Sequence, residues 1–259
     1  MGKIIAITTP KGGVGKTTTA VNLAIGIAQN GKRVLLLDLD GAGQCAPTLG
    51  FKSRSINGDI LDVLSFKKSF KSVIHKTSDK NLDFIPMRGL DYAHELKLSK
   101  FTSDELIIKS ILSDEIFSYN YVIVDCPPSL IGTTTNILMT ADSTIIPVKA
   151  SRYSLNEVVR ILKHMQLVKQ NYNSKLKVEG ILLTMYEAHT RAAFYTKKIL
   201  MKEFPNELFN IVIPKNVEVA EATFHNKPII YYNPEAKSSI AYKNLAEEIV
   251  RRNSIPILD

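Results

Sequence analysis

A glycine- and lysine-rich run near the amino end carries the strongest chemical signal in the chain. It reads Lys11-Gly12-Gly13-Val14-Gly15-Lys16-Thr17-Thr18. Glycines let a backbone curl until successive N–H groups point at phosphate oxygens, and the start of a following helix adds a favourable dipole. Lys16 would reach the β and γ phosphates, and the Thr17 hydroxyl would bind Mg²⁺. The run predicts a nucleotide site rather than a glycine turn that binds nothing.

Three carboxylates are placed to complete that site. Asp38 and Asp40 follow the leucine run 35–37 at alternate positions, which puts them on one side of a strand. Asp125 ends the apolar run 121–124, where a metal-side carboxylate of a phosphate-loop ATPase belongs. We expect Asp38 and Asp125 to support Mg²⁺, and Asp40 to contact the metal side and orient the attacking water. A simple loop-capping role for these aspartates is the alternative.

The elements around these residues alternate between short apolar runs and longer stretches of helical spacing, which predicts an α/β fold: a single phosphate-loop domain over 1–259 with a mostly parallel twisted sheet and helices on both faces. The expected strands are Lys3–Thr8, Arg33–Asp38, Leu82–Pro86, Tyr121–Asp125, Ser143–Val148, Val178–Thr184 and Leu208–Ile213. The expected helices are Lys16–Gln29, Ser103–Phe117, Thr133–Thr140, Ser154–Asn171, Arg191–Glu203 and Pro234–Arg252.

Composition narrows the class of protein. The 259 residues carry 33 basic and 25 acidic side chains, a net charge of +8 that suggests an anionic partner such as nucleic acid or an acidic membrane. No apolar run reaches the roughly 18 residues of a membrane span, and the start lacks a secretory signal, so we expect a cytoplasmic protein. Two cysteines, Cys45 and Cys126, cannot build a disulfide framework.

The loop departs from the common spacing because Pro10 stands where that spacing begins with a glycine, and Lys11 follows it. In this form it resembles the deviant phosphate loop of the ParA/MinD class of ATPases. The whole chain is similar to the ParA/Soj partition ATPases, almost end to end. The further matching segments are Asp125-Cys126-Pro127-Pro128-Ser129, Leu182-Leu183-Thr184-Met185, Ile213-Pro214-Lys215-Asn216-Val217, Glu221-Ala222 and Lys227-Pro228-Ile229.

The resemblance implies a switch driven by ATP and Mg²⁺. Lys11 would cross a homodimer interface to the phosphates of the other subunit, where a second cation would complement the transferred charge. Pro214 and Asn216 would lie against the adenine. The ATP dimer would bind DNA without sequence preference, and a ParB/Spo0J-type centromere-binding partner would stimulate hydrolysis. The expected localisation is nucleoid- or plasmid-associated. A solvated surface lysine is the alternative for Lys11.

Two departures from the family pattern affect these expectations. The segment after Asp40 reads Gly41-Ala42-Gly43-Gln44 instead of P-Q-G-N, which leaves the hydrolysis rate open. His189 and Glu218 stand in segments where relatives often carry arginine. Either DNA binding is weaker, or dispersed basic residues carry it. The candidates are Arg191, Lys197, Lys198, Lys202, Lys215, Lys243, Arg251 and Arg252, each with a solvated helix face as the alternative.

Two rival classes remain open. A MinD-like membrane-associated ATPase needs a terminal amphipathic helix, whereas the apolar run 245–249 is short and Pro256 follows Arg251 and Arg252. An iron–sulfur reductase would hold a cluster between subunits through thiolates, and Cys126 lies near the predicted site. We expect both cysteines to be small packed residues. The five histidines show no close ligand spacing, so metal catalysis beyond Mg²⁺ is not expected.

Overall fold

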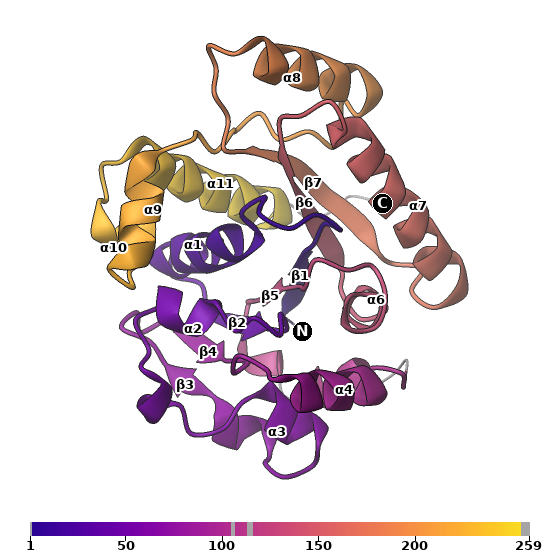
Figure 1. Ribbon diagram of the computed structural model, residues 1–259, viewed down its shortest axis with the longest axis vertical. Coiled ribbons are helices and arrows are strands. Elements are labelled where there is room, and N and C mark those ends of the chain that lie inside the picture. Colours follow the sequence, from indigo (N-terminus) through magenta and orange to yellow (C-terminus); the bar gives the residue numbers. More distant parts are fainter. Residues whose placement is uncertain (1, 105–106, 113–115, 255–259) are drawn as a thin grey trace.

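The computed structural model describes residues 2–104, 107–112 and 116–254, and it confirms the α/β architecture. Seven strands form one twisted sheet in the order β3-β4-β2-β5-β1-β6-β7 (Figure 1). All neighbours are parallel except β3, which runs antiparallel to β4. The strands are β1 Lys3–Ile7, β2 Val34–Asp38, β3 His75–Lys76, β4 Leu82–Ile85, β5 Tyr121–Asp125, β6 Ser143–Lys149 and β7 Lys177–Thr184.

The central strands are apolar on both faces because helices cover both sides of the sheet. β2 and β5 are buried along their whole length. Their pairing places Asp38 directly opposite Asp125, each at the carboxyl end of its strand. In open parallel sheets this is the edge where ligands bind. The register of two apolar strands therefore brings two carboxylates side by side.

One face of the sheet is covered by α1 and α11, with three shorter helices beside them (Figure 1). Gly26 of α1 allows the closest approach, because a Cβ atom there would lie 2.7 Å from the Cβ of Ala246 in α11. This face therefore packs helix backbone against helix backbone. The helices are α1 Lys16–Gln29, α2 Cys45–Thr48, α9 Val217–Phe224, α10 Ile229–Tyr232 and α11 Lys237–Ser254.

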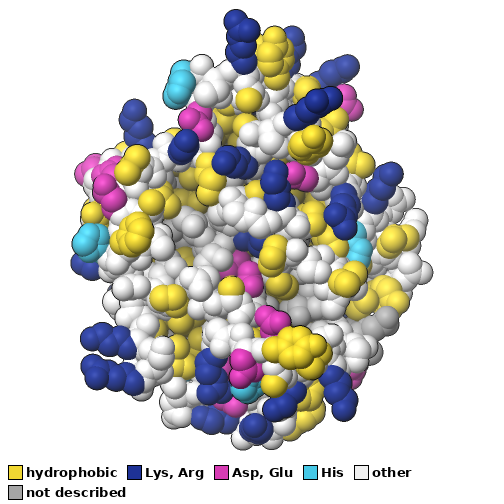
Figure 2. All heavy atoms as spheres, viewed as in Figure 1, with side chains coloured by type: hydrophobic (Ala, Val, Ile, Leu, Met, Phe, Trp, Pro, Cys, Tyr) yellow, Lys and Arg dark blue, Asp and Glu magenta, His cyan; other side chains and the backbone are white. Residues whose placement is uncertain are grey.

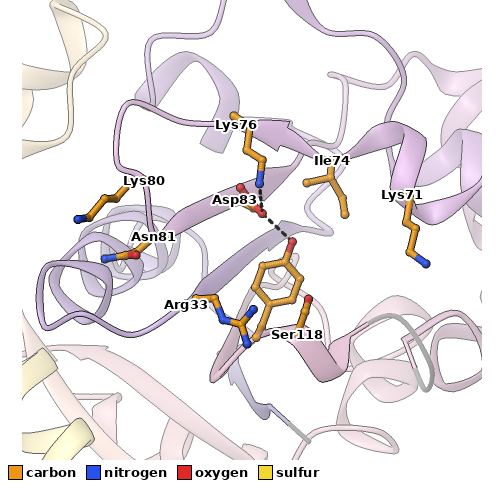
Figure 3. A pocket seen from close by; sticks show the side chains of 9 residues that line it. Arg33, Lys71, Ile74, Lys76, Lys80, Asn81, Asp83 and Ser118 are labelled. Atoms are coloured by element: carbon orange, nitrogen blue, oxygen red, sulfur yellow. Dashed lines mark hydrogen bonds and ion pairs between the residues drawn. The ribbon is translucent and has the colours of Figure 1, made fainter.

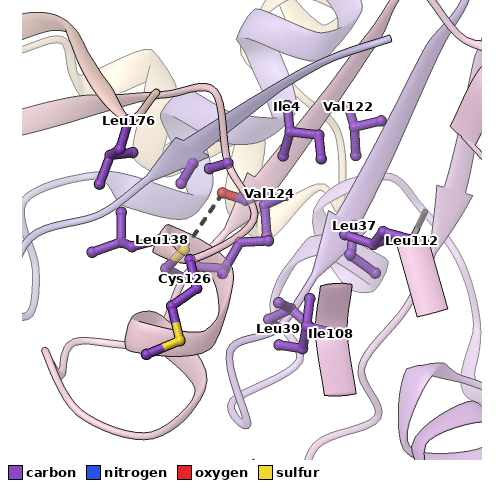
Figure 4. Close-up of a cluster of buried hydrophobic side chains, with 14 of the residues drawn as sticks. Ile4, Leu37, Leu39, Ile108, Leu112, Val122, Val124, Cys126, Leu138 and Leu176 are labelled. Atoms are coloured by element: carbon purple, nitrogen blue, oxygen red, sulfur yellow. Dashed lines mark hydrogen bonds between the residues drawn. The ribbon is translucent and has the colours of Figure 1, made fainter. Parts of the chain in front are cut away.

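The other face buries a second apolar cluster, part of which is drawn in Figure 4. Leu37, Val122 and Val124 contribute to it from the sheet, and Ile108 and Leu138 from the helices. The α-helices of this layer are α3 Ile60–Leu64, α4 Tyr92–Phe101, α5 Ile107–Leu112, α6 Thr133–Leu138, α7 Ser154–Asn171 and α8 Arg191–Glu203. The described residues also form three 3₁₀ turns, η1 Ser53–Ser55, η2 Phe70–Val73 and η3 Ile116–Ser118.

The expected strand Leu208–Ile213 is wrong. Among the described residues, this segment makes one isolated bridge to β7, between Leu208 and Ile181, and just beyond both elements Pro214 bridges to Tyr186. The amide of Phe209 donates to the Ile181 carbonyl, and the amide of Ile213 donates to the Leu183 carbonyl. Four positions on the segment therefore span two positions on β7, which breaks the ladder. The apolar run instead buries the Phe209 side chain against β7.

Three expected helices end or begin elsewhere. In place of Ser103–Phe117 the structure has α5 over Ile107–Leu112, while positions 105–106 and 113–115 of the expected helix lie outside the described residues. The expected helix Thr133–Thr140 ends at Leu138, and the one expected from Pro234 begins at Lys237. Proline has no N–H and fixes its own φ, so Pro234 lies just ahead of the helix that follows it.

Candidate nucleotide site

The glycine-rich loop lies between β1 and α1, as the sequence predicts. Gly13 and Gly15 have φ values of 71° and 82°, a left-handed backbone that favours glycine. Gly15 caps α1, which begins at Lys16. The Thr184 hydroxyl, at the end of β7, donates a 2.8 Å hydrogen bond to the Val14 carbonyl. This hydrogen bond ties the loop to the end of β7, on the far side of the sheet, and α1 follows the loop directly.

Lys16 is folded back over this loop. Its Nζ atom donates to the carbonyl of Lys11 at 3.2 Å, and the residue is 7 % exposed. Burial lowers the pKa of Lys16, while the carboxylates of Asp125 and Asp40 raise it. An ammonium beside the glycine loop, facing carboxylates, is the arrangement that holds the β and γ phosphates of a nucleotide.

Asp38 and Asp125 form a fully buried acidic pair at the carboxyl edge of the sheet, each 0 % exposed. The backbone N–H groups of Asp40 and Cys45 donate to the two oxygens of Asp38 at 3.0 and 3.2 Å. The Cys45 thiol donates to Oδ2 of Asp125 at 3.5 Å. Oδ1 of Asp125 has no hydrogen-bond partner among the described residues.

Burial controls the protonation of this pair. It raises the pKa of Asp125 to about 7, although the Thr17 hydroxyl and the Lys16 ammonium act in the opposite direction. Burial, followed by the charge of Asp125, raises the pKa of Asp38 well above its ordinary value. A divalent cation would supply the missing positive charge, and the unpartnered oxygen of Asp125 supplies a hard ligand atom for it. The residues present therefore fit Mg²⁺.

Asp40 lies two residues beyond β2 and is half-buried. Its side chain accepts a 3.0 Å hydrogen bond from the N–H of Ala42, which closes a tight turn over the altered segment 41–44. Asp40 also borders a cavity of about 640 Å³ between the loops that follow β2 and β5. Asp40, the carboxylate predicted to orient water, therefore lies at the mouth of the site, whereas Asp38 and Asp125 are buried at its floor.

Lys11 reaches away from the loop toward α7. Its Nζ atom lies 2.8 Å from Oε1 of Glu157, in the first turn of that helix. The Lys11 side chain is 39 % exposed and that of Glu157 16 %. The second oxygen of Glu157 is buried and unpartnered among the described residues. In the single chain Lys11 is therefore paired with Glu157, and its role at a dimer interface stays a prediction.

A largely apolar cavity of about 470 Å³ lies beside the loop. Gly15 and Thr18 line it from the loop side, and Pro214 and Asn216 line it from the opposite wall. The Asn216 side chain caps α9 by accepting from the N–H of Glu218 at 3.0 Å. Its amide in turn donates to Glu218 at 2.9 Å. The Glu218 side chain is thereby hydrogen-bonded to a residue of the cavity wall.

The eight basic candidates do not form one cluster. Those on α8 belong to the layer of α7, and those on α11 belong to the opposite layer with α1. Four are engaged within the chain: Lys197 over the Tyr186 ring, Lys215 with Glu187, Lys243 with the Pro234 carbonyl, and Arg252 with Glu248. The others, Arg191, Lys198, Lys202 and Arg251, are exposed. Figure 2 shows basic side chains spread over the viewed face, with dark blue groups at the upper and lower ends.

A second basic surface lies elsewhere, around a cavity of about 400 Å³ at the amino ends of β2, β4 and β5. Arg33, Lys76 and Lys80 line it (Figure 3). Its floor is Asp83, which accepts hydrogen bonds of 2.8 Å from Lys76 and from the Tyr119 hydroxyl. The nucleotide loop is at the other end of the strands, so this cavity belongs to a separate face.

The sequence predicts no role for Glu157 or Thr184, and only a packing role for Cys45. Thr184 stands in a segment that carries the family resemblance, which was the available signal. Glu157 follows β6 in an ordinary helical stretch, and nothing local marks it. Cys45 is fully buried, as expected of a small packed residue, but it packs against two carboxylates.

Comparisons with known proteins agree with this geometry. The family model described as "AAA domain" matches residues 2–178. The sporulation initiation inhibitor protein Soj of Bacillus subtilis is 40% identical over 249 residues, covering 96% of this chain and 98% of that protein. The chromosome-partitioning ATPase Soj of Thermus thermophilus is 35% identical, covering 96% and 95%. The septum site-determining protein MinD of Pyrococcus horikoshii, solved with Mg-ADP, superposes with a TM-score of 0.78 at 25% identity, covering 99% and 100%.

A mostly parallel sheet, a glycine loop ending in Lys-Thr and a buried acidic pair at the strand edge define a phosphate-loop ATPase. With the similarity to Soj extending over nearly its whole length, the chain belongs to the ParA/Soj family of partition ATPases. Within the described residues, no helix combines the length and the apolar character that crossing a membrane requires. Pro256, the residue expected to stop a terminal membrane helix, lies outside the described residues.

Proposed function

We propose that the chain is an ATP-dependent DNA partition ATPase that works as a nucleotide-controlled homodimer. The observation that carries the proposal is the double-lysine loop: Lys16 faces the acidic pair, while Lys11 leaves the loop in another direction and stops on Glu157. A single bound nucleotide needs only the first cation. The second cation, Lys11, would contact a triphosphate bound to another copy of the chain.

The described residues divide the work of binding and hydrolysis. The loop amides of residues 12–15 and the start of α1 would cradle the phosphates, and Lys16 would hold the β and γ oxygens. The cavity with Pro214 and Asn216 would take the adenine. Thr17, Asp38 and Asp125 would hold Mg²⁺, which neutralises charge that develops on the γ phosphate. Asp40, at the mouth of the site, would orient the attacking water.

The dimer is the form that would bind DNA. Exposed Lys and Arg side chains attract phosphates without reading bases, which suits a protein that must hold any sequence. Arg191, Lys198 and Lys202 on α8 are available for such contacts in the single chain. Lys197, Lys215, Lys243 and Arg252 would contribute only after leaving partners within the chain.

A centromere-binding protein of the ParB type would then trigger hydrolysis and release. The cavity between the loops after β2 and β5 holds Asp40 and Gly41 on one wall and Pro128 and Ser129 on the other. A partner that moved these loops would move the residue proposed to orient water. The expected association with nucleoid or plasmid follows from DNA binding.

The test is size-exclusion chromatography of the wild type and Lys11→Ala with ADP and then with ATP. We expect a monomer with ADP and a dimer with ATP for the wild type, and a monomer in both cases for the variant. ATP binding, measured separately by equilibrium dialysis, should persist in Lys11→Ala because Lys16 is intact. A wild type that stays monomeric with ATP contradicts the dimer, and sedimentation with liposomes in the absence of DNA would favour a membrane-associated ATPase instead.

A further inference from the structure

The buried acidic pair has a third member that a purely magnesium-binding site does not need. Asp38, Cys45 and Asp125 each offer one ligand atom, and these three atoms lie within 4.8 Å of one another. All three residues are 0 % exposed. We propose that they form a binding site for a thiophilic divalent cation of the zinc class. This proposal concerns a cation other than Mg²⁺, and it does not depend on ATP hydrolysis.

The donor set decides the kind of cation. Mg²⁺ takes oxygen ligands in a near-octahedral shell and has little affinity for sulfur. Thiolate selects softer ions, and three protein ligands with a fourth open position are the usual pattern of an open Zn²⁺ site. One sulfur and two carboxylates give that pattern at the carboxyl ends of β2 and β5 and the start of α2.

The distances agree with this assignment. Tetrahedral Zn²⁺ bonds of about 2.3 Å to sulfur and 2.1 Å to oxygen place the two donor atoms about 3.6 Å apart. Sγ of Cys45 lies 3.5 Å from Oδ2 of Asp125. The backbone N–H of Cys45 is anchored on Asp38 at 3.2 Å, so the thiol is fixed by the same carboxylate that would be its co-ligand.

The carboxylate oxygen that fits Mg²⁺ is also open to this cation when nucleotide and Mg²⁺ are absent. Oδ1 of Asp125 is buried without a hydrogen-bond partner among the described residues. An unsatisfied buried carboxylate oxygen costs free energy, which a bound cation would recover. On binding, the cation would form a bond to Cys45 sulfur as the S–H bond breaks, and the displaced proton would leave to solvent.

The other cysteine is the natural control. Cys126 is also fully buried and adjoins Asp125 in sequence, but its Sγ atom faces the carbonyl of Val124 at 3.9 Å within the apolar cluster of Figure 4. It belongs to none of the candidate ligand groups among the described residues. Cys126 thus shares the burial and the chemistry of Cys45, but among the described residues its thiol faces a backbone carbonyl instead of a carboxylate oxygen.

The experiment titrates Co²⁺, as the probe for the zinc class, into nucleotide-free protein and records the thiolate-to-cobalt charge-transfer band. We expect a saturable band with one equivalent, removed by chelator. Cys45→Ala should abolish it, Cys126→Ala should leave it unchanged, and Asp125→Asn should weaken Co²⁺ affinity by about 10-fold or more. Calorimetry with Zn²⁺ should rank the proteins identically, and circular dichroism should confirm that each variant is folded.

A wild type without the band, or a band that survives in Cys45→Ala, overturns the proposal. So does a band that depends on Cys126. If Cys45→Ala is unfolded, Cys45→Ser with Asp125→Asn decides the question, because both should weaken Zn²⁺ binding measured by calorimetry. Since nucleotide is absent throughout, these results leave the proposed ATPase function untouched, and its own chromatography test stands separately.

Discussion

Lys11 and Glu157 form an ion pair of 2.8 Å within one chain, joining the nucleotide loop to the first turn of α7. The proposed role of Lys11 places the same ammonium on a partner's phosphates, so the pair must break before the dimer forms. The buried Oε2 of Glu157 makes no compensating hydrogen bond among the described residues. Glu157 therefore holds the lysine in the single chain and opposes its transfer.

Replacing this glutamate should favour the dimer. A homodimer breaks two such pairs, one in each chain, and a partly exposed ion pair contributes about 1 kcal/mol or less, so Glu157→Gln should lower the ATP-dependent dimer dissociation constant by up to about 30-fold. Analytical ultracentrifugation with ATP measures it. Glu203→Gln, at the exposed end of α8, is the matched control and should change nothing. A weaker dimer in Glu157→Gln would mean that the glutamate supports the closed state instead.

Asp40→Ala should separate dimer formation from hydrolysis. Its carboxylate is proposed to orient water and does not bind the adenine or the loop, so ATP should still bind. Loss of a group that assists proton transfer typically costs about 10²- to 10⁴-fold in rate. We expect a persistent ATP dimer on size-exclusion chromatography and phosphate release reduced by about 100-fold or more. Phosphate release at the wild-type rate would remove Asp40 from the mechanism.

DNA retention in the presence of ATP should fall steeply with salt. Each phosphate contact contributes about 0.9 to the slope of log affinity against log salt on duplex DNA. Lys198→Glu with Lys202→Glu, both exposed on α8, should weaken binding and reduce that slope. Fluorescence anisotropy at several salt concentrations gives both numbers. The matched pair Arg33→Glu with Lys80→Glu, at the separate cavity of Figure 3, should leave the slope unchanged.

Glu179 should make folding stability depend on acid pH. Burial alone would raise the pKa of Glu179, but the Lys3 ammonium at 2.5 Å and the hydrogen bonds from Ser143 and Asn253 outweigh it and lower the pKa below its ordinary 4.5. A lowered carboxyl pKa stabilises the fold above the unfolded value, and this stability is lost as pH falls through the folded value.

The corresponding variant is Glu179→Gln. We expect it to cost about 1–3 kcal/mol of unfolding free energy at neutral pH and to flatten the loss of stability below pH 4.5. Urea unfolding across that range measures both effects. Glu235→Gln, on an exposed residue, should retain the wild-type pH profile. An unchanged profile in Glu179→Gln would show that another carboxylate governs acid unfolding.

Gly26→Ala should destabilise the protein even though alanine favours helices. The added Cβ would meet the Cβ of Ala246 at 2.7 Å, in the contact between α1 and α11. Overpacking costs about 1–3 kcal/mol and helix propensity returns about 1, so we expect a net loss of up to about 2 kcal/mol in chemical denaturation. Gly89→Ala, whose nearest atom lies at an ordinary 3.7 Å, should be neutral. Equal stability of both variants would contradict close packing at Gly26.

The sequence by itself determined the features that depend on residues close together in the chain. The loop 11–18 is contiguous with its strand and its helix. Composition alone predicts the buried strands that end in Asp38 and Asp125. A parallel sheet then brings strand ends to one edge, so their meeting could be predicted as well. Helix α7 was predicted with its exact bounds because its apolar period extends over 18 residues.

Only the tertiary structure decided which distant groups touch. Lys11 and Glu157 are 146 positions apart, and Thr184 meets Val14 across 170. No local pattern records such a pair, because its energy exists only once the sheet has fixed both elements. The same reason explains the failed strand Leu208–Ile213, where apolar composition suits β structure but the edge of β7 and the Phe209 side chain set a different path. Local periodicity determined where helices and strands form, and packing determined which distant groups touch.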